Sequence, residues 1–578
     1  MRLRLSVLAA LSLVLGVAVA ASPAWGAQGS RFRPAVSGQL GVVATEAPAA
    51  ARVGRRALER GGNAVDAAVS TVFALNVARP QSCGIGGGGF MVYRSAHGQT
   101  AALDFRETAP QAFTPDTLQG PGLHNTFTGH LTVGVPGVLA GMDAALKRYG
   151  TFSLARALAP AERLASRGVR VTPALSASMS ANATRLKLFP AAANQYLVGG
   201  QTPYPAGSIL RQPLLARSLR AIERRGPRAL YRGRIARLIA RDMDATRQSP
   251  QPGDAAVMVK RDLAGYQAKW RSPLEGSFRG RGLVTMPPPT SGGIAIVEML
   301  NLLEGFDLRA EGQSSADELH QIIESQKIAW ADRNEYVADP DFVHVPPELT
   351  TKSYADKRRA EIDMAHAKKF EPGLGPYSPA RASNAGETGS TTHISIVDRR
   401  GNAVSLTCTI EQEFGSAVVA PGTGFLLNNE LTDFGRPGTA NEARAGKRPR
   451  SSMSPIIATE AGRPITVTGG AGGSRIVMGT LFTVLDRIEF GLDLAHAVDA
   501  ERLDAQSAPE QPVFIEGSRV SPGVIAELER RGHTFTDEGE YGPKPRVQAA
   551  GFKSSHGATK QAVSDPRTEA GSLAQRHR

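Results

Sequence analysis

The chain has 578 residues, a formal net charge of +14 and a sequence pI near 9.9. Its Lys and Arg residues are scattered, with the densest runs at 217–241 and 567–578, and aromatic residues make up only 6% of the chain. No basic block is interleaved with aromatic residues, so we expect no nucleic-acid partner and predict a solvated, arginine-rich surface instead.

The first 26 residues predict a signal peptide. A basic start, MRLR, precedes an apolar run from Leu5 to Ala20, and the small residues Ala24 and Gly26 offer a cleavage site. The run is short for a membrane anchor and Ser-Pro follows it closely, although an uncleaved anchor is the alternative. No other stretch is apolar enough to span a bilayer, so we expect a periplasmic or secreted protein without stable membrane insertion.

Helical and irregular segments follow in a clear order. Residues 54–77 predict two helices separated by Gly61-Gly62, and residues 313–336 predict one long helix with Ser315 as its N-cap. The segment 371–390 is rich in Gly, Pro and Ser and predicts an exposed linker. Residues 566–578 predict a loose C-terminal tail.

The chain contains two cysteines, Cys83 and Cys408. An oxidising compartment permits a disulfide but does not require one, and two residues provide no framework pattern. The sequence therefore leaves their pairing open and favours two separate cysteines.

Residues 391–410 predict a β-hairpin. Apolar residues alternate with polar or small ones on both sides of residues 398–402, which is the period-two pattern of half-buried strands. A three-residue loop with Gly401 in the left-handed region sets a register in which Thr391 faces Thr409. A loop longer by one residue would put a neighbour of Thr409 there instead.

Thr391 stands directly after the predicted linker, where self-cleavage would expose it as a nucleophile. A threonine hydroxyl needs an adjacent base at neutral pH, and a cut before the threonine makes its own α-amino group that base. The sequence therefore predicts cleavage between Ser390 and Thr391. The alternative is an ordinary threonine in an edge hairpin.

Several further motifs, in order along nearly the whole mature chain, resemble those of the γ-glutamyltranspeptidase family. They are GGNAVDAAV (61–69), DFRETAP (104–110), MPPPTSGG (286–293), LLNNELTDF (426–434), KRPRSSMSP (447–455) and SDPR (564–567). The resemblance implies an α+β fold, a four-layer αββα sandwich of the N-terminal nucleophile hydrolase type. It also implies a large fragment (27–390) and a small fragment (391–578) that stay together as a heterodimer.

The activity that the resemblance implies is γ-glutamyl acyl transfer. The enzyme would hydrolyse glutathione and other γ-glutamyl compounds and transfer the γ-glutamyl group to amino acids or peptides. Its acyl chemistry would need neither a metal ion nor an organic cofactor.

The catalytic residues implied by the resemblance are Thr391 as nucleophile, Thr409 as auxiliary threonine, and Gly472 and Gly473 as the oxyanion hole. The two glycines lie in VTGGAGGSR (467–475), before a predicted helix whose N-terminus favours negative charge. The family usually has Ser-Pro before the glycine pair, where this chain has Gly-Ala. A plain glycine-rich turn is the alternative.

The implied substrate-binding residues form two groups, one for each charged end of a free amino acid. Arg106, Ser451 and Ser452 would bind the α-carboxylate, a role that suits a planar guanidinium. Glu411, Glu430 and Asp433 would bind the α-ammonium. A solvated acidic turn is the alternative, mainly for Glu411, and Arg450 departs from the apolar residue usual in its motif without an assigned role.

Two other functions stay open. A β-lactam side-chain acylase of the same fold (glutaryl/cephalosporin) would act on glutaryl-type side chains, which lack the α-ammonium, and the acidic residues Glu430 and Asp433 argue against it. A non-catalytic secreted binding protein is opposed by retention of the whole catalytic set.

The chain differs from some family members in the segment that forms a lid over bound glutamate. Only thirteen residues separate Asp433 from Lys447, whereas family members with a lid carry a longer insert there. The chain resembles the lidless members, so we expect hydrolysis to compete strongly with transfer.

Overall fold

The computed structural model describes residues 32–118, 127–249, 253–376, 389–506, 511–542 and 545–576. The predicted signal peptide (1–26) and most of the predicted linker lie outside the described residues. Within the described ranges, no helix combines the length and apolar character needed to cross a bilayer.

Two large sheets form the centre of the molecule, each with seven strands among the described residues. The first sheet has the order β1 (Val36–Gly38), β20 (Lys560–Ser564), β19 (Arg546–Phe552), β15 (Arg463–Ala471), β14 (Ile456–Glu460), β11 (Arg281–Thr285) and β10 (Leu274–Phe278). The second has the order β21 (Leu573–Ala574), β2 (Val42–Thr45), β12 (Thr391–Val397), β13 (Ala403–Thr409), β3 (Gly88–Arg94), β4 (Thr100–Asp104) and β9 (Lys269–Arg271). Small sheets contain β5 (Val169–Arg170) with β8 (Ile209–Leu210), β6 (Leu197–Val198) with β7 (Thr202–Pro203), and β16 (Leu503–Asp504), β17 (Val513–Ile515) and β18 (Phe535–Asp537).

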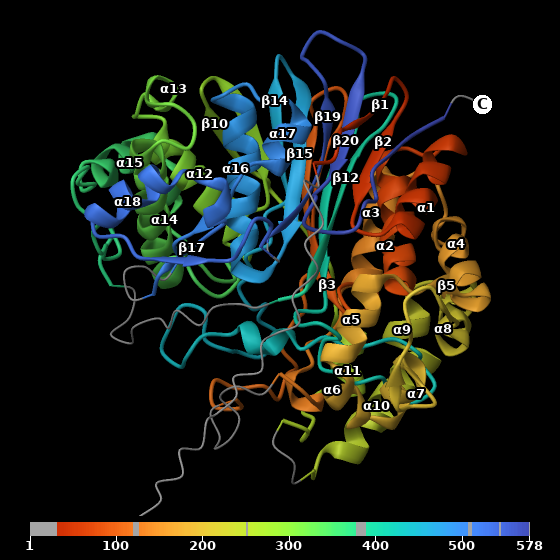
Figure 1. Cartoon of the computed structure of the whole chain (residues 1–578). Coiled ribbons are helices and arrows are strands. Elements are labelled where there is room, and N and C mark those ends of the chain that lie inside the picture. The colour runs from red at the N-terminus through yellow and green to blue at the C-terminus, as the bar shows by residue number, and fades with distance from the viewer. Residues whose placement is uncertain are drawn as a thin grey trace, which may run out of the picture.

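Helices cover the outer faces of both large sheets (Figure 1). On the side of the second sheet lie α1 (Pro48–Glu59), α2 (Ala64–Ala78), α3 (Val138–Tyr149), α4 (Leu154–Arg167), α5 (Pro173–Ala181), α6 (Ala183–Lys187), α7 (Pro190–Tyr196), α8 (Pro213–Arg225), α9 (Arg228–Tyr231), α10 (Arg234–Thr246) and α11 (Lys260–Gly265). On the side of the first sheet lie α12 (Gly292–Leu303), α13 (Leu308–Glu311), α14 (Ala316–Tyr336), α15 (Lys352–Arg359), α16 (Ile476–Ile488), α17 (Leu494–Asp499) and α18 (Pro522–Arg530). Short 3₁₀ turns are η1 (His130–Thr132), η2 (Pro347–Thr350), η3 (Glu430–Asp433), η4 (Gly473–Arg475) and η5 (Gly517–Arg519).

The two sheets face each other across a buried apolar layer. Phe90 and Val92 of β3 lie in this layer together with Val467 of β15 and Phe552 of β19. Separate apolar cores join each sheet to its own helices. The order helix, sheet, sheet, helix confirms the predicted four-layer αββα sandwich, in which the sheet faces bury their apolar side chains on both sides.

The helices predicted from the sequence are confirmed. The break at Gly61 separates α1 from α2, and Gly61 has a φ of +87°. The side chain of Asn63 accepts hydrogen bonds from the backbone N–H groups of Val65 and Asp66, which begins α2. Ser315 is the N-cap of α14, and its Oγ accepts a hydrogen bond from Glu318 N.

The predicted hairpin register is also confirmed. Thr391 pairs with Thr409 across β12 and β13, and Gly401 has a φ of +95°. Asp398 holds the turn, because one carboxylate oxygen accepts the backbone N–H groups of residues 400–402. Its other oxygen accepts Ala64 N, so the hairpin is tied to the start of α2.

The predicted loose tail at 566–578 is wrong for the residues that the structure describes, which end at 576. Leu573 and Ala574 form β21, which pairs with β2 at the edge of the second sheet. The buried guanidinium of Arg567 forms an ion pair with Glu516. The edge of a sheet offers unpaired N–H and C=O groups, and the polar composition of the tail did not reveal this tertiary partner.

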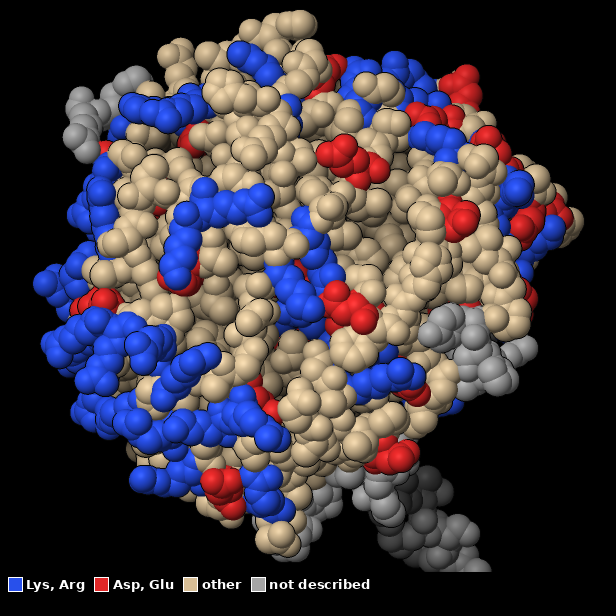
Figure 2. Space-filling model, turned by 180° about the vertical axis from the view of Figure 1, so that it is seen from behind, with Lys and Arg blue, Asp and Glu red and all other residues tan. Residues whose placement is uncertain are grey.

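The arginine-rich stretch lies on the surface, as expected. Arg217, Arg224, Arg228, Arg234 and Arg241 are exposed on α8, α9 and α10. Figure 2 shows Lys and Arg gathered at the lower left of the rear face, the side on which these helices lie.

Candidate active site

Thr391 is the first residue of β12, a strand in the interior of the second sheet. The residue is buried, and Gly389 and Ser390 precede it directly in the uncut chain. A pocket at this end of the sheet brings together nine of the ten predicted catalytic and substrate-binding residues, namely Arg106, Thr391, Thr409, Glu411, Glu430, Asp433, Ser451, Ser452 and Gly473. Gly472, the tenth, is adjacent to Gly473 and is not among the lining residues described.

A chain of hydroxyl contacts surrounds the Ser390–Thr391 peptide bond. Thr391 Oγ1 donates to Thr409 Oγ1 at 3.2 Å, and Thr409 Oγ1 donates to the Ser390 carbonyl oxygen at 3.3 Å. Glu411 N donates to Thr409 Oγ1 at 2.9 Å, which fixes that hydroxyl. The contact from Thr409 draws electron density from the carbonyl carbon beside Thr391.

Two contacts that the sequence did not predict hold Ser390 itself. Ser390 N donates to the Glu411 carbonyl oxygen, and Ser390 Oγ lies 2.8 Å from Ser82 Oγ. Ser82 comes from the loop between α2 and β3, more than 300 residues away in sequence. Such a distant partner leaves no local signal in the chain.

The glycine-rich segment 467–475 crosses from β15 into η4 and α16. Gly472 and Gly473 have φ values of +136° and +64°, which an L side chain rarely adopts. Gly473 lines the pocket beside Thr391. The helix that follows was predicted and is confirmed as α16, so its N-terminal end lies next to the pocket.

Close packing against His393 explains why a glycine stands at position 469 in the same segment. A Cβ placed there would lie 2.4 Å from Cε1 of His393, the buried histidine of β12. His393 Nδ1 bonds Thr407 Oγ1 at 2.8 Å, and its Nε2 bonds Ser395 Oγ at 3.1 Å. Burial lowers the pKa of His393 to about 3, so the imidazole is neutral between the sheets.

Arg106 joins the acidic residues of the pocket. Its Nη2 donates to Asp433 Oδ2 at 2.5 Å and its Nη1 contacts Glu430 Oε2, while Glu107 Oε2 is 3.8 Å from Nη1. Its Nε donates to the backbone carbonyl of residue 449, and its Nη2 also donates to that of residue 450. Arg106 is therefore fixed at the wall of the pocket by three carboxylates and two carbonyls.

This arrangement places three carboxylates around one guanidinium. Burial raises the pKa of Glu107 to about 8 against the opposing effect of Arg106. Burial also raises the pKa of Glu430 well above its usual value, and Glu107 and Asp433 add to the shift. The pKa of Arg106 is raised because its carboxylate neighbours outweigh burial. Near neutral pH the raised pKa values favour protonated carboxyl groups here, and an additional cation would favour their charged forms.

The two serines lie on the segment after Arg450. Ser452 Oγ accepts a hydrogen bond from Arg333 Nη2 at 2.7 Å, and the Ser451 carbonyl accepts from the backbone N–H and the Oγ of Ser291, both at 2.7 Å. Arg333 also donates from Nε to Ser291 Oγ. The predictions missed Arg333 and Ser291, although Ser291 lies in the quoted MPPPTSGG motif.

Arg450, which had no assigned role, binds the C-terminal end of α14. Its Nη1 donates to the carbonyl oxygens of Arg333, Asn334 and Val337, where unpaired helix carbonyls favour a cation. Arg450 thus holds the helix that carries Arg333 against the serine segment.

The short segment 434–446 folds back onto the body of the protein. Phe434, its only aromatic residue, packs against Phe113 with ring centroids 6.0 Å apart. Asn441 Nδ2 donates to the Asp433 carbonyl at 2.7 Å. None of these residues lines the pocket in the part of the chain that the structure describes.

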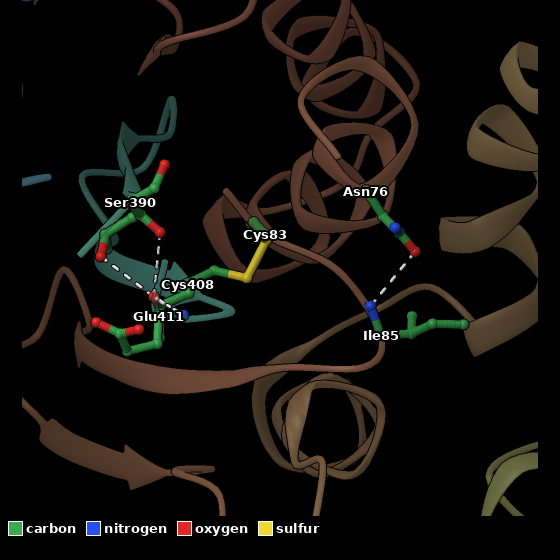
Figure 3. The surroundings of a disulfide bond; sticks show 8 residues. Asn76, Cys83, Ile85, Ser390, Cys408 and Glu411 are labelled. Atoms are coloured by element: carbon green, nitrogen blue, oxygen red, sulfur yellow. Dashed lines mark hydrogen bonds between the residues drawn. A yellow bond between two sulfur atoms is a disulfide. The ribbon is translucent and has the colours of Figure 1, made fainter. Parts of the chain in front are cut away.

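The expectation of two separate cysteines is wrong. Cys83 and Cys408 form a disulfide with Cα atoms 5.4 Å apart (Figure 3). Strand pairing sets Cys408 opposite Gly89 of β3, and the loop before β3 returns Cys83 to the same place. The pairing depends on this contact between distant segments, which two isolated cysteines do not reveal.

Comparison with known proteins adds a consistent result. The family model described as Gamma-glutamyltranspeptidase matches residues 50–575. The chain is 39% identical to a glutathione hydrolase proenzyme of Escherichia coli (strain K12), over 98% of this chain and 97% of that protein. It is 38% identical to an acylase ACY 1 proenzyme of Pseudomonas sp. (strain V22), over 86% of this chain and 87% of that protein.

Solved structures are similar as well. A cephalosporin acylase from Bacillus halodurans superposes with a TM-score of 0.85 at 29% identity, covering 96% of this chain and 99% of that chain. A γ-glutamyltranspeptidase from Helicobacter pylori superposes with a TM-score of 0.54 at 36% identity, covering 58% of this chain and 95% of that chain.

Proposed function

The chain belongs to the γ-glutamyltranspeptidase family, and from that membership we propose that it hydrolyses glutathione and other γ-glutamyl compounds and transfers the γ-glutamyl group to amino acids or peptides. One observation carries the proposal. The hydroxyl of Thr391 shares its pocket with a buried guanidinium and three carboxylates, the charges that match a free amino-acid end.

The first step of the proposal is self-cleavage. Thr391 Oγ1 attacks the Ser390 carbonyl carbon, the peptide C–N bond breaks, and the nitrogen of Thr391 takes a proton to become a free amine. Water then hydrolyses the resulting ester and leaves a carboxylate on Ser390. The hydrogen bond from Thr409 to the Ser390 carbonyl supports this step, because it polarises the carbon that is attacked.

Cleavage also prepares the pocket. Gly389 lines it in the uncut chain, and a Cβ on Gly389 would lie 3.6 Å from the Cα of Gly473. Departure of this segment frees the space beside Thr391. The products are a large fragment (27–390) and a small fragment (391–578), which stay together because strands of both fragments pair with one another within each large sheet.

Acyl transfer then uses the new amine as the base. Thr391 Oγ1 attacks the γ-carbonyl, and its amine takes the proton and passes it to the leaving amine. The amides of Gly472 and Gly473 stabilise the oxyanion, and water or an acceptor amine cleaves the γ-glutamyl ester.

Recognition in this proposal depends on charge. Arg106, Ser451 and Ser452 bind the α-carboxylate, while Glu411, Glu430 and Asp433 bind the α-ammonium. The raised pKa values of Glu107 and Glu430 support the second part, because a substrate cation would replace the protons that this acidic group holds.

The second candidate is acylase activity on glutaryl or cephalosporin substrates. Its support is the similarity to an acylase proenzyme and to a cephalosporin acylase structure. Glutaryl side chains lack the α-ammonium, so the buried acidic group would face no cation. Comparing kcat/KM for γ-glutamyl and glutaryl anilides separates the two, and a preference for the glutaryl compound would overturn our proposal.

The proposed location is the periplasm or the exterior of the cell, after removal of residues 1–26. The basic and apolar start of the sequence supports this, as does the disulfide, since such bonds persist in oxidising compartments. N-terminal sequencing of protein from a cell fraction tests both points.

A further inference from the structure

The disulfide lies across the proposed cleavage point. Cys83 belongs to the fragment that ends at Ser390, and Cys408 belongs to the fragment that begins at Thr391. The two residues are 325 positions apart in sequence, and Figure 3 shows their sulfur bond close to Ser390 and Glu411.

Each cysteine is adjacent to a residue that contacts Ser390. Ser82 precedes Cys83, and its Oγ lies 2.8 Å from Ser390 Oγ. Thr409 follows Cys408, and its hydroxyl donates to the Ser390 carbonyl. The disulfide thus joins the two backbone segments that hold the bond to be cut.

The far side of the Cys83 loop is fixed as well. Asn76, near the end of α2, accepts a hydrogen bond from Ile85 N through its side-chain oxygen (Figure 3). Arg79, at the start of the loop, forms an ion pair with Glu46 at 2.5 Å. Ser82 therefore lies on a short loop whose two ends are held by contacts outside the Ser390 segment, in addition to the disulfide.

We propose that the Cys83–Cys408 disulfide covalently links the two fragments of the matured protein, and that it holds Ser82 as a positioning residue for the Ser390–Thr391 bond. The inference rests on the proposed self-cleavage. It adds a covalent connection and a residue of the large fragment to that reaction.

The link changes how the matured protein unfolds. Two fragments without a covalent connection gain translational and rotational freedom when they separate, so their thermal midpoint rises with protein concentration. Linked fragments cannot separate, so unfolding is unimolecular. The wild-type Tm should be independent of concentration over a hundred-fold range.

Burial protects the link from the thiols of the proposed chemistry. Both cysteines have no exposed surface, and thiol–disulfide exchange requires a thiolate to reach a sulfur atom. Glutathione is a thiol, and an exposed disulfide would exchange with it. We therefore expect reduced glutathione to leave the link intact in the folded protein and to open it only in denaturant.

Alkylation and intact mass provide the decisive test, because the chain has no other cysteine. Matured protein is unfolded in denaturant and alkylated with iodoacetamide. One sample is alkylated without reductant and the other after reduction. Without reductant we expect one unalkylated species with the combined mass of both fragments. After reduction we expect two species, each with one alkyl group.

Two separate alkylated fragments without reductant would overturn the link. A single full-length chain in both conditions would overturn the self-cleavage, and with it any link between fragments. In that case the number of alkyl groups still reports whether the disulfide forms, so failure of the cleavage is distinguished from failure of the bond.

The positioning role of Ser82 is tested by the rate of fragment appearance after cell-free synthesis of the full chain under oxidising conditions. Ser82→Ala should slow cleavage roughly 2- to 10-fold, as expected for one lost neutral hydrogen bond, and Ser82→Thr should restore it. The kcat/KM of the fully cut enzyme should not change. Ser95→Ala, at another buried serine, is the matched control. A cleavage rate of Ser82→Ala equal to that of the wild type would exclude the positioning role of Ser82.

Discussion

The hydroxyl of Thr409 connects the proposed nucleophile, Thr391, to the Ser390–Thr391 bond that it is proposed to cut. It accepts a hydrogen bond from Thr391 and donates one to the Ser390 carbonyl, while Glu411 N holds it in place. Glu411 reaches this position with a φ of +71°, a conformation that costs a non-glycine residue about 1 kcal/mol or more. The backbone around Ser390 is thus shaped for this contact.

Replacement of the nucleophile gives the first prediction. Thr391→Ala should remain a single uncut chain, because no hydroxyl is left to attack the Ser390 carbonyl. Intact mass of the purified protein checks this. A fragment beginning at residue 391 in that variant would mean that a separate protease makes the cut.

Removal of Arg106, the proposed substrate clamp, gives the second prediction. Arg106→Ala should still be cut but should lose kcat/KM on a γ-glutamyl anilide by roughly 30- to 5000-fold, the usual effect of losing one partner of a charge-assisted pair. Steady-state kinetics on the matured enzyme measure it. Arg448→Ala is the matched control, since Arg448 is an equally buried arginine that pairs with Asp104. Unchanged kinetics in Arg106→Ala would exclude Arg106 from the pocket.

At the scale of elements, β12 carries the proposed nucleophile, Thr391, at one end and a buried histidine two residues later. The imidazole of His393 lies against the backbone of β15, where only a glycine fits at position 469. The contact couples the second sheet to the first, two residues along β12 from Thr391. It also makes the packing of these strands sensitive to acid.

The third prediction follows from this histidine. Its pKa is lowered to about 3 by burial, below the value near 6.5 of an unfolded chain, so the unfolded state binds the proton more readily between these values. The stability contribution is complete above pH 6.5 and is lost as the pH falls toward 3, by up to about 5 kcal/mol. Buried His533, with a pKa also lowered to about 3, adds a similar loss.

Thermal midpoints measured from pH 7.5 to 4 test this effect. His393→Gln should lower the midpoint at neutral pH and flatten its decline on acidification. His496→Gln, at an exposed position, should leave the shape of the profile unchanged. An identical acid decline in wild type and His393→Gln would show that other groups cause it.

At the scale of the whole molecule, residues 434–446 do not form a lid, because none of them is among the residues that line the pocket. Phe434 packs against Phe113, Asn441 donates to the Asp433 carbonyl, and neither residue is among those that line the pocket. An acyl-enzyme in this pocket would remain accessible to water and to bulky leaving groups.

The fourth prediction concerns the products. With a γ-glutamyl donor and excess glycylglycine, free glutamate should form in amounts comparable with the transfer product, and longer γ-glutamyl chains should also be cleaved. Chromatography of the products over time provides the ratio. Near-exclusive transfer together with intact γ-glutamyl oligomers would refute the lidless interpretation.

The sequence predicted the local elements and the nearby register because their signals lie within a few residues. Gly401 and the alternation on both sides of it determined the pairing of Thr391 with Thr409, and Ser315 marked the start of α14. The family resemblance implied roles for nine residues that the structure brings into one pocket, five of which lie in the quoted motifs. Their catalytic roles stay predictions.

Only the tertiary structure revealed the contacts between segments that are far apart in the sequence. The Cys83–Cys408 bond, the contact of Ser82 with Ser390, and the addition of β21 to the sheet edge each join residues more than 300 positions apart. Such contacts form because buried polar groups and sheet edges must find partners within the folded chain. Composition and periodicity carry no record of which distant residue becomes that partner.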